Sequence, residues 1–363
     1  GRPYGDDTSK KPRQRCAVRQ LHEKRGARWF GGGRLGVDLE CAPAFRVGGM
    51  KRVRIGSLEV SALCLGTLPF GKYVDEETSF AILDRFVEAG GTFLDTANNY
   101  VFWDGGTGDE SEETVGRWLA ARGNRDDVVV ATKMGARPRT PGAGLEDAEG
   151  LAGATVRAAA EGSLKRLGTD RIDLYYSHIE DRSVALEDTL GGFASLVEAG
   201  SVREIGASNH ATWRLERARA VSRAHGWPLY TAVQQRFSYL LPRPGVKLPE
   251  GGHVHMTEEV FDYARAEGDV ALVAYSALLF GGYRDKPLGE AYDHPGTERR
   301  LAVLREVAVE VGATVNQVVL AWLLRKGIVP LVGASSVAQL EESLGGVELE
   351  LGDEHVGRLD SVA

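Results

Sequence analysis

The sequence predicts an α/β chain that folds as one (β/α)8 TIM barrel with an N-terminal β-hairpin. Short β-type runs alternate regularly with helical patterns, and eight such strand–helix units follow the hairpin. Regular alternation implies parallel strands joined by helical crossovers, and eight is the number that closes a barrel. An open doubly wound sheet is the alternative, but it normally carries a glycine fingerprint after its first strand. Here that strand ends in Leu65-Gly-Thr-Leu-Pro-Phe-Gly71, which does not match.

The hairpin and the first helix illustrate how the elements are predicted. The runs Arg52–Ile55 and Leu58–Val60 flank a Gly-Ser turn, and Asp75 opens a helix with apolar residues at helical spacing. The predicted core strands are residues 62–65, 92–94, 128–132, 172–176, 202–206, 231–235, 270–274 and 328–332. Of the later predicted helices, the first begins at Ser111 and the next five cover 152–167, 185–198, 211–224, 256–266 and 298–311. Another begins at the capping box Thr314-x-x-Gln317, and the last covers 336–344 and is followed by a final amphipathic turn.

Residues 1–49 differ from the rest, so we interpret them as a disordered or non-native extension and assign the folded domain to residues 50–363. The extension is rich in Lys and Arg, lacks periodicity and has no apolar core of a secretory signal. Its Gly31-Gly-Gly-Arg-Leu-Gly36 fits the dinucleotide pattern GxGxxG by letter. That pattern needs a helix after it, and Pro43 stands where the helix would run.

Composition limits the classes of function. The chain has 363 residues, of which 43% are hydrophobic and 26% charged, and its formal charge is −7. This acidic balance argues against binding of duplex nucleic acid, which needs a basic surface. The sequence has no apolar run near the roughly 20 residues of a membrane-spanning helix. Its three cysteines show no CxxC spacing, so we expect a reducing cytoplasm.

Polar side chains stand at successive predicted strand ends, where barrel enzymes place their reactive groups. In order they are Asp95 and Tyr100, then Lys133, His178, Ser208 with Asn209, Gln234, and Tyr275 with Ser276. Each has an ordinary alternative: the carboxylate could cap a turn, the phenol pack as a plain aromatic, the lysine or histidine lie on the surface, and the Ser-Asn pair cap the next helix. Their joint occurrence favours one shared site at the mouth of the barrel.

These motifs resemble those of the aldo-keto reductase family over most of the predicted domain, from about residue 53 to 359. Asp95-Thr-Ala-Asn-Asn-Tyr100, Ala131-Thr-Lys133 and Asp173-Leu-Tyr-Tyr-Ser-His178 match the family's motifs in order. The resemblance implies a catalytic tetrad of Asp95, Tyr100, Lys133 and His178. An ammonium group beside the phenol favours the phenolate and eases proton donation, and the imidazole can hold the substrate oxygen.

The resemblance also implies a nicotinamide cofactor. Ser208, Asn209 and Gln234 would hold the carboxamide, and Tyr275 would stack on the ring. The other expected contacts are Gly66, Thr67, Asp95, Ser276, Leu278, Gly333, Ser335, Gln339, Glu342 and Ser343. Segment 333–339 has no Arg or Lys to pair with the 2′-phosphate of NADPH. Ser335 or Gln339 could hydrogen-bond that phosphate instead, and Arg284 or Lys286 could reach it from the loop after the seventh strand. We therefore predict NADPH, with NADH open.

Two departures from the family pattern affect the cofactor segments. Ala277 stands where the family often has proline, and the loop to Gly296 differs in spacing, which leaves the pyrophosphate contacts open. Ser343 stands where an asparagine is usual and offers a shorter side chain to the adenine. We predict no metal, because the pair His253-x-His255 has no evident further ligands.

The predicted function is interconversion of a carbonyl (aldehyde, ketone or sugar-like keto group) and an alcohol by hydride transfer, with a small-molecule substrate as the partner. Phe102 and Trp103 follow the expected acid and should line the substrate pocket, or else stack on barrel helices. A regulatory subunit that binds cofactor but turns over slowly is the alternative. A barrel isomerase or hydrolase is disfavoured, because the strand ends lack paired carboxylates and a metal cluster. Substrate, reaction direction and oligomeric state stay open.

Overall fold

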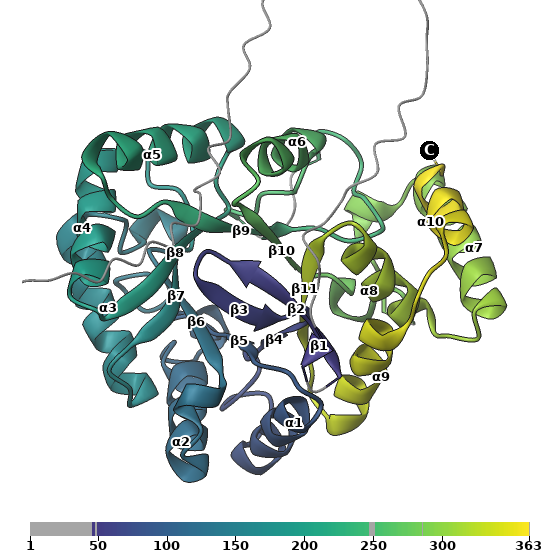
Figure 1. Cartoon of the computed structure of the whole chain (residues 1–363), viewed down its shortest axis with the longest axis horizontal. Helices are drawn as coiled ribbons and strands as arrows, with labels where there is room; N and C mark the ends of the chain where they lie inside the picture. The colour runs from purple at the N-terminus through teal and green to yellow at the C-terminus, as the bar shows by residue number, and fades with distance from the viewer. Residues whose placement is uncertain (1–45, 48, 247–250, 285, 363) are drawn as a thin grey trace, which may run out of the picture. The chain divides into compact units, whose positions relative to one another are not determined.

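Eight parallel strands close into a barrel in this computed structural model, which describes residues 46–47, 49–246, 251–284 and 286–362 (Figure 1). The barrel strands are β4 (Cys64–Gly66), β5 (Phe93–Asp95), β6 (Val129–Met134), β7 (Ile172–Ser177), β8 (Val202–Ser208), β9 (Tyr230–Arg236), β10 (Ala271–Tyr275) and β11 (Ile328–Gly333). Each pairs in parallel with the next, β11 pairs with β4, and no barrel edge is left open among them. The predicted barrel is therefore confirmed, and the open sheet is excluded.

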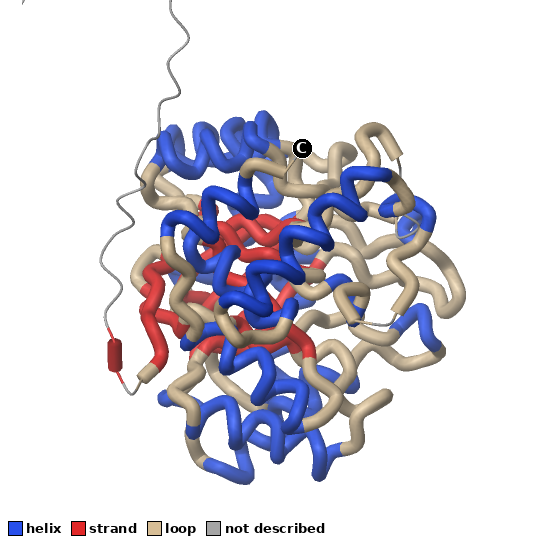
Figure 2. The backbone as a smooth tube through the Cα atoms, turned by 90° about the vertical axis from the view of Figure 1, so that its right-hand side faces the viewer, coloured by secondary structure: helices blue, strands red, loops and turns tan. Residues whose placement is uncertain are grey.

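Helices surround the barrel on the outside (Figure 2). They are α1 (Glu76–Glu88), α2 (Glu110–Arg122), α3 (Gly153–Leu167), α4 (Leu186–Glu198), α5 (Thr212–His225), α6 (Glu258–Glu267), α7 (Pro295–Glu310), α8 (Val315–Arg325), α9 (Val337–Glu348) and α10 (Asp353–Asp360). The predicted caps form: Asp75 accepts from the backbone N–H of Thr78 at 2.8 Å, and Thr314 and Gln317 make a reciprocal capping box.

Two helices differ from their predicted bounds. Helix α7 begins at Pro295, three residues before the predicted 298, because proline is tolerated in the first turn of a helix. Helix α9 continues to Glu348, past the predicted end at 344 and through Gly345 and Gly346. A Cβ at Gly346 would lie 3.0 Å from Leu320 in α8, so a residue without a side chain lets the two helices approach closely.

The N-terminal hairpin fills one end of the barrel (Figure 1). Strands β2 (Met50–Ile55) and β3 (Leu58–Ser61) pair antiparallel as predicted, and the short β1 (Arg46–Val47) adds an unpredicted third strand. The turn requires Gly56 at φ +54°, and the N–H of Ser57 donates to Glu204 Oε1 of β8 at 2.8 Å. Ile55, Leu58 and Val60 of the hairpin belong to the same buried cluster as the barrel interior.

Strand residues alternate between two cores. One cluster fills the barrel and includes Cys64, Phe93, Ala131, Leu174, Tyr176, Ala232, Val273 and Val329. The residues between them face the surrounding helices and belong to the larger outer core. Gly206 of β8 makes room in the barrel, because a Cβ there would lie 2.5 Å from the ring of Tyr176. This strict alternation decides which side chains emerge at the barrel mouth.

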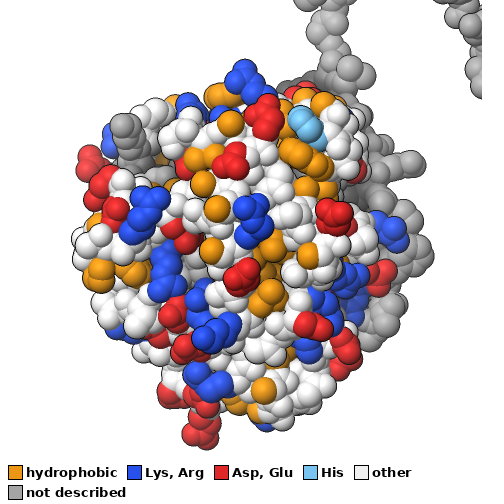
Figure 3. Space-filling model, turned by 90° about the vertical axis from the view of Figure 1, so that its left-hand side faces the viewer, with side chains coloured by type: hydrophobic (Ala, Val, Ile, Leu, Met, Phe, Trp, Pro, Cys, Tyr) orange, Lys and Arg blue, Asp and Glu red, His pale blue; other side chains and the backbone are white. Residues whose placement is uncertain are grey.

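Basic and acidic side chains are interspersed on the face of the molecule at α3, α4 and α5 (Figure 3). Within the described ranges, no single helix is long and apolar enough to cross a membrane, and α7 and α8 pass that test only together, across a 97° bend. The proposed extension 1–49 falls almost entirely outside the described residues. The GxGxxG match at 31–36 does so completely.

Candidate active site

Polar groups gather at the barrel mouth because they continue the inward-facing pattern of the strands. Successive inward side chains on a strand are two residues apart. Phe93 and Ala131 lie in the barrel core, so Asp95 and Lys133, each two residues further on, also point inward at the C-terminal end. Gln234 and Tyr275 follow the core residues Ala232 and Val273 in the same way, on β9 and β10. The alternation alone therefore brings these polar groups to one end of the barrel.

The Lys133 ammonium group is the centre of the site. Its Nζ atom lies 2.6 Å from the Tyr100 hydroxyl oxygen and 2.9 Å from the carbonyl oxygen of Thr96, and it pairs with the carboxylate of Asp95. The lysine side chain is 1% exposed and the aspartate 0%, so the ion pair is fully buried. These three partners use all three ammonium protons and fix the direction of the side chain.

Asp95 joins the phenol to a second strand. Its Oδ1 accepts from the Tyr100 hydroxyl at 3.2 Å as well as from the ammonium group, while Oδ2 accepts from Gln234 Nε2 at 2.9 Å. The carboxylate is thus hydrogen-bonded at both oxygens, which compensates for its burial. Asp95 therefore acts as the common acceptor of the site rather than as the cap of a turn.

The Tyr100 phenol is held in its protonated form. Loss of solvent around the hydroxyl raises its pKa well above the ordinary value, and the charge and hydrogen bond of Asp95 raise the pKa further. We expected Lys133 to favour the phenolate, but in this arrangement the effects that raise the pKa are larger. A proton is therefore present on Tyr100 across the neutral range, and Lys133 is placed to stabilise the phenolate once that proton leaves.

His178 is the fourth side chain of the catalytic tetrad that the sequence motifs predicted. Its ring lies 6.2 Å from the Tyr100 ring, centroid to centroid, at an interplanar angle of 77°. Burial lowers the pKa of the imidazole well below its ordinary value, and the positive charge of Lys133 and the nearby His253 lower it further. The ring is therefore neutral near pH 7. Its Nδ1 atom is buried and has no hydrogen-bond partner among the described residues.

The residues expected to hold a carboxamide contact one another. Asn209 Nδ2 donates to the carbonyl of His178 at 3.0 Å and to Ser208 Oγ at 3.2 Å, and its Oδ1 accepts from the Tyr275 hydroxyl at 2.6 Å. Gln234 lies in the same region but donates to Asp95. The Ser-Asn pair does not cap the next helix, because the N-cap of α5 is Ala211.

The remaining expected cofactor residues fall into two groups. Near β4 and β10, the Thr67 hydroxyl donates to the Asp95 carbonyl at 3.0 Å, whereas Ser276 Oγ is buried without a partner among the described residues. At β11 and α9, Ser335 Oγ lies 3.0 Å from Gln339 Oε1, and Ser343 is buried with its hydroxyl on the Gln339 carbonyl. The others are Gly66, buried in β4, Leu278, half-buried after β10, Gly333 at the end of β11, and Glu342, whose Oε2 lies 3.5 Å from Arg284 Nη1.

Three residues that directly follow site side chains adopt the left-handed backbone conformation. Val101, Asn209 and Ser276 have φ of 59°, 56° and 54°. They come immediately after Tyr100, Ser208 and Tyr275. Residues other than glycine rarely adopt this conformation, and a β-branched valine almost never does, so such strain is typical of functional sites.

The aromatic residues after Tyr100 lie at the rim of the barrel. Phe102 and Trp103 form a short 3-10 turn, and their rings are 6.1 Å apart at 76°. Trp103 is 50% exposed and Phe102 half-buried. Leu68, Tyr73 and Phe280 are also exposed in loops that follow barrel strands. This rim offers apolar surface for a substrate, although the lining roles remain predictions.

The structure adds one side chain that the sequence did not place. His253 lies with its ring 5.2 Å from that of Tyr275, and its Nδ1 accepts from Arg236 Nη1 at 3.3 Å. The His-x-His pattern drew attention to this residue as a metal ligand. In the described part of the chain, no group of three or more His, Cys, Asp or Glu side chains could hold a metal ion.

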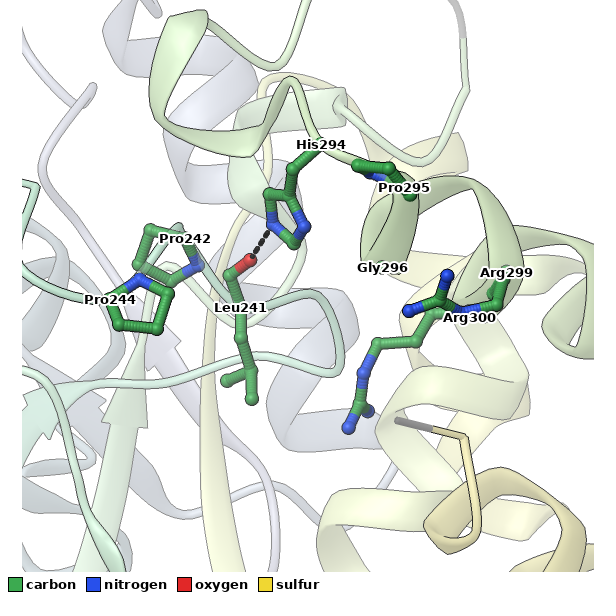
Figure 4. A pocket seen from close by; sticks show the side chains of 8 residues that line it. All are labelled: Leu241, Pro242, Pro244, His294, Pro295, Gly296, Arg299 and Arg300. Carbon is green, nitrogen blue, oxygen red and sulfur yellow. Dashed lines mark hydrogen bonds between the residues drawn. The ribbon is translucent and has the colours of Figure 1, made fainter.

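A surface hollow formed by described residues lies outside this site. It has a volume of about 460 Å³ and lies between the loop after β9 and the start of α7 (Figure 4). Leu241, Pro242 and Pro244 form one side, and His294 bonds across it to the Leu241 carbonyl at 2.9 Å. None of the four motif side chains lines this hollow, so it is not where their chemistry would occur.

Comparison with known proteins agrees with the geometry. The sequence profile of the aldo/keto reductase family matches residues 62–363. Norsolorinic acid reductase stcV of Emericella nidulans is 34% identical over 327 residues, covering 84% of this chain and 79% of that protein. Oxidoreductase YrpG of Bacillus subtilis is 33% identical, covering 84% and 93%. The solved structure of the thermostable aldo-keto reductase Tm1743 with the inhibitor epalrestat has a TM-score of 0.67 at 28% identity, covering 86% of this chain and 99% of that one. The chain therefore belongs to the aldo/keto reductase family of oxidoreductases.

Proposed function

We propose that this enzyme interconverts a carbonyl compound and an alcohol with NAD(P)H, and that Tyr100 is the proton donor. The observation that carries the proposal is the 2.6 Å contact between Lys133 Nζ and the Tyr100 hydroxyl oxygen, inside a buried network that ends on Asp95. A phenol that is protonated at neutral pH and has an adjacent ammonium group is suited to donate a proton to an alkoxide. Family members typically use NAD(P)H, which supports the cofactor assignment.

The roles of the four side chains follow from their contacts. The bound cofactor supplies the hydride. The Tyr100 hydrogen turns from Asp95 Oδ1 to the substrate oxygen and is donated as charge develops there. Lys133 then stabilises the phenolate through the bond it already makes, and Asp95 keeps the ammonium group oriented. Neutral His178 directs an N–H to the same substrate oxygen and fixes its position.

The residues present fit a nicotinamide cofactor. The buried hydroxyl of Ser276 has no partner among the described residues and can serve a polar group of the cofactor. A Cβ at Gly333 would meet no atom within 4 Å, which leaves room for a phosphate or ribose to approach the backbone at the end of β11. Ser208, Asn209 and Tyr275 would bind the nicotinamide end, and Ser335, Gln339 and Glu342 the adenosine end.

For the substrate we propose a chemical class and no single compound. The exposed aromatic rim and the similarity to norsolorinic acid reductases support a small-molecule carbonyl substrate with a large apolar part. Trp103, Phe102 and Tyr73 would contact that part. NADPH is the preferred cofactor in this proposal, and the cytoplasm is the proposed compartment.

The proposal is tested by titrating the protein with NADPH and NADH and then screening aldehydes, ketones and alcohols for turnover. Tyr100→Phe should lower kcat by about 1,000-fold, because general acid catalysis contributes about 100- to 10,000-fold. The dissociation constant for NADPH should change by less than about twofold, because the hydroxyl is assigned to proton transfer.

Tyr263→Phe is the matched control, since its hydroxyl bonds Glu216 at 2.7 Å on the outside of the barrel. Loss of NADPH binding together with turnover in Tyr100→Phe would contradict the assigned role. Tight cofactor binding without turnover by the wild-type protein on every compound would favour the regulatory alternative.

A further inference from the structure

We propose that Arg137 and Glu149, in the loop after β6, are positioning residues for Tyr100, an inference that rests on the proposed role of Tyr100 as proton donor. Neither side chain belongs to the tetrad. Both bind the segment 96–109 that carries Tyr100 from β5 to α2. Lys133 lies in β6 itself, four residues before Arg137. The two partners of the central 2.6 Å contact are thus held by one strand and the loop that follows it.

Arg137 joins both ends of the Tyr100 segment. Its Nη1 donates to the carbonyl of Asn98 at 2.9 Å and to Asp109 Oδ1 at 2.6 Å. Its Nη2 donates to the carbonyl of Thr107 at 2.9 Å. The planar guanidinium group can make these three bonds at fixed angles, which a lysine ammonium cannot reproduce. The chain before Tyr100 and the chain after it are therefore tied to a single side chain.

Glu149 holds the same segment from the other side of its loop. Its Oε1 accepts from Asn98 Nδ2 at 2.8 Å and from the N–H of Gly135 at 2.7 Å. The N–H of Glu149 donates to the carbonyl of Arg137 at 2.7 Å, so the two positioning residues are paired across the loop. The N–H of Asn98 donates to the Lys133 carbonyl at 3.1 Å. Three polar groups of Asn98, two residues before Tyr100, are thus fixed by β6 and its loop.

The conformation held in this way is strained. Val101 is buried and has φ of 59° and ψ of 8°, which a β-branched residue rarely adopts. Such a conformation persists only when surrounding contacts determine it. A relaxed Val101 would rotate the backbone next to Tyr100 and carry the phenol away from Lys133. The bonds of Arg137 and Glu149 supply the constraint on both sides of that residue.

Removing Arg137 or Glu149 should therefore lower the rate of turnover without lowering the affinity for the cofactor. Displacing a reacting group by about 1 Å costs on the order of 100-fold in rate. The residues assigned above to the two ends of the cofactor lie at the C-terminal ends of β8, β10 and β11 and on α9, outside segment 96–109, so the affinity for the cofactor should be nearly unchanged. A Tyr100 phenolate that loses its ammonium partner is also less stable, so the pH at which alcohol oxidation rises should increase.

The test uses the full chain with NADPH and 4-nitrobenzaldehyde for reduction, and with NADP⁺ and 4-nitrobenzyl alcohol for the reverse reaction. Arg137→Met and Glu149→Ala should each lower kcat by about tenfold or more while the NADPH dissociation constant stays within about twofold. The rising limb of kcat for oxidation should move up by about one pH unit. Glu149→Gln should restore nearly wild-type kcat, because an amide oxygen still accepts from Asn98 and Gly135. Arg137→Lys should recover only part of the activity.

Arg117→Met is the matched control, since this arginine of α2 makes an exposed ion pair with Glu76 of α1. Wild-type kcat and an unmoved pH limb in Arg137→Met and Glu149→Ala would overturn the inference, as would equal loss in Glu149→Gln and Glu149→Ala. If these variants do not fold, Asn98→Ala removes only the bond to Glu149 and should lower kcat by about threefold with the same pH shift. An active Tyr100→Phe would instead show that the proposed function is wrong, whatever the loop variants do.

Discussion

Lys133 Nζ lies 2.6 Å from the Tyr100 hydroxyl oxygen, although the two residues are 33 positions apart and come from different strand–loop units. The parallel pairing of β5 and β6 sets this distance, because it aligns Asp95 with Ala131, two residues before Lys133. The pairing places the acid, the ammonium group and the phenol in one buried network. Several of its consequences can be measured.

Removing one partner of the buried ion pair should destabilise the fold strongly. Lys133→Met leaves the carboxylate of Asp95 uncompensated, which costs about 3–5 kcal/mol in the free energy of unfolding. The double variant Asp95→Asn with Lys133→Met should recover at least about half of that loss, because no buried charge is left unpaired. Turnover should stay absent in both. Urea unfolding of Lys133→Met, Asp95→Asn and the double variant measures the coupling energy between the two side chains. If the losses in the free energy of unfolding are additive, the prediction is wrong.

His210 should make stability sensitive to acid. Burial lowers the pKa of this imidazole from 6.5 to about 4 in the folded protein, so the unfolded chain binds more protons between these values. The stabilisation is therefore complete above pH 6.5 and is lost as the pH falls toward 4. Between pH 7 and pH 5, His210→Asn should remove about 2 kcal/mol of the wild-type decrease in the free energy of unfolding. His225→Asn on the exposed end of α5 is the control, and identical pH dependence in all three proteins would refute the prediction.

Gly333 should matter for the cofactor and not for the fold. A Cβ there meets no atom within 4 Å, whereas one at Gly66 would lie 2.6 Å from Leu331. Gly333→Ala should therefore leave the thermal midpoint unchanged while raising the NADPH dissociation constant about tenfold, because the added methyl occupies the proposed approach of the cofactor. Gly66→Ala should lower the midpoint. Unchanged NADPH affinity in Gly333→Ala would place the cofactor elsewhere.

Arg284 should distinguish the two nicotinamide cofactors. Its side chain is 59% exposed, and its Nη1 atom lies 3.5 Å from Glu342 Oε2, next to the proposed adenosine segment. A charge-assisted bond to the 2′-phosphate at such an exposed position should be worth about fivefold in affinity. Arg284→Met should raise the NADPH dissociation constant by that factor and leave the NADH value unchanged. Equal effects on both cofactors would exclude a phosphate contact, and Arg325→Met, in an exposed pair with Asp353, is the control.

The sequence predicted the fold well where the signal was local and periodic. The barrel strands begin and end within about two residues of their predicted bounds, because alternation and turn residues mark them. The predictions were weaker where packing overrides propensity. Helix α9 continues through Gly345 and Gly346 because those glycines fit against α8, and β1 forms only because its partner β2 lies beside it.

Some features of the candidate site could be predicted from the sequence, and others could not. Alternation with the barrel core brought Asp95 and Lys133 to one end, so their proximity followed from the sequence once the barrel was assumed. The bond from Gln234 to Asp95, in place of an amide free for the cofactor, could not be read from spacing. Neither could the ring contact between His253 and Tyr275, since it depends on the path of the long loop after β9.

By itself the sequence determined the alternation of strands and helices and the chemical groups that stand at the strand ends, because a two-residue period and turn residues are properties of neighbouring positions. The tertiary structure alone decided the left-handed backbone at Val101, the hydrogen bonds from Arg137 and Glu149 to the Tyr100 segment, and the raised pKa of the Tyr100 phenol. These features arise between loops far apart in the chain. Hydrogen bonding and desolvation there depend on distances that no local pattern encodes.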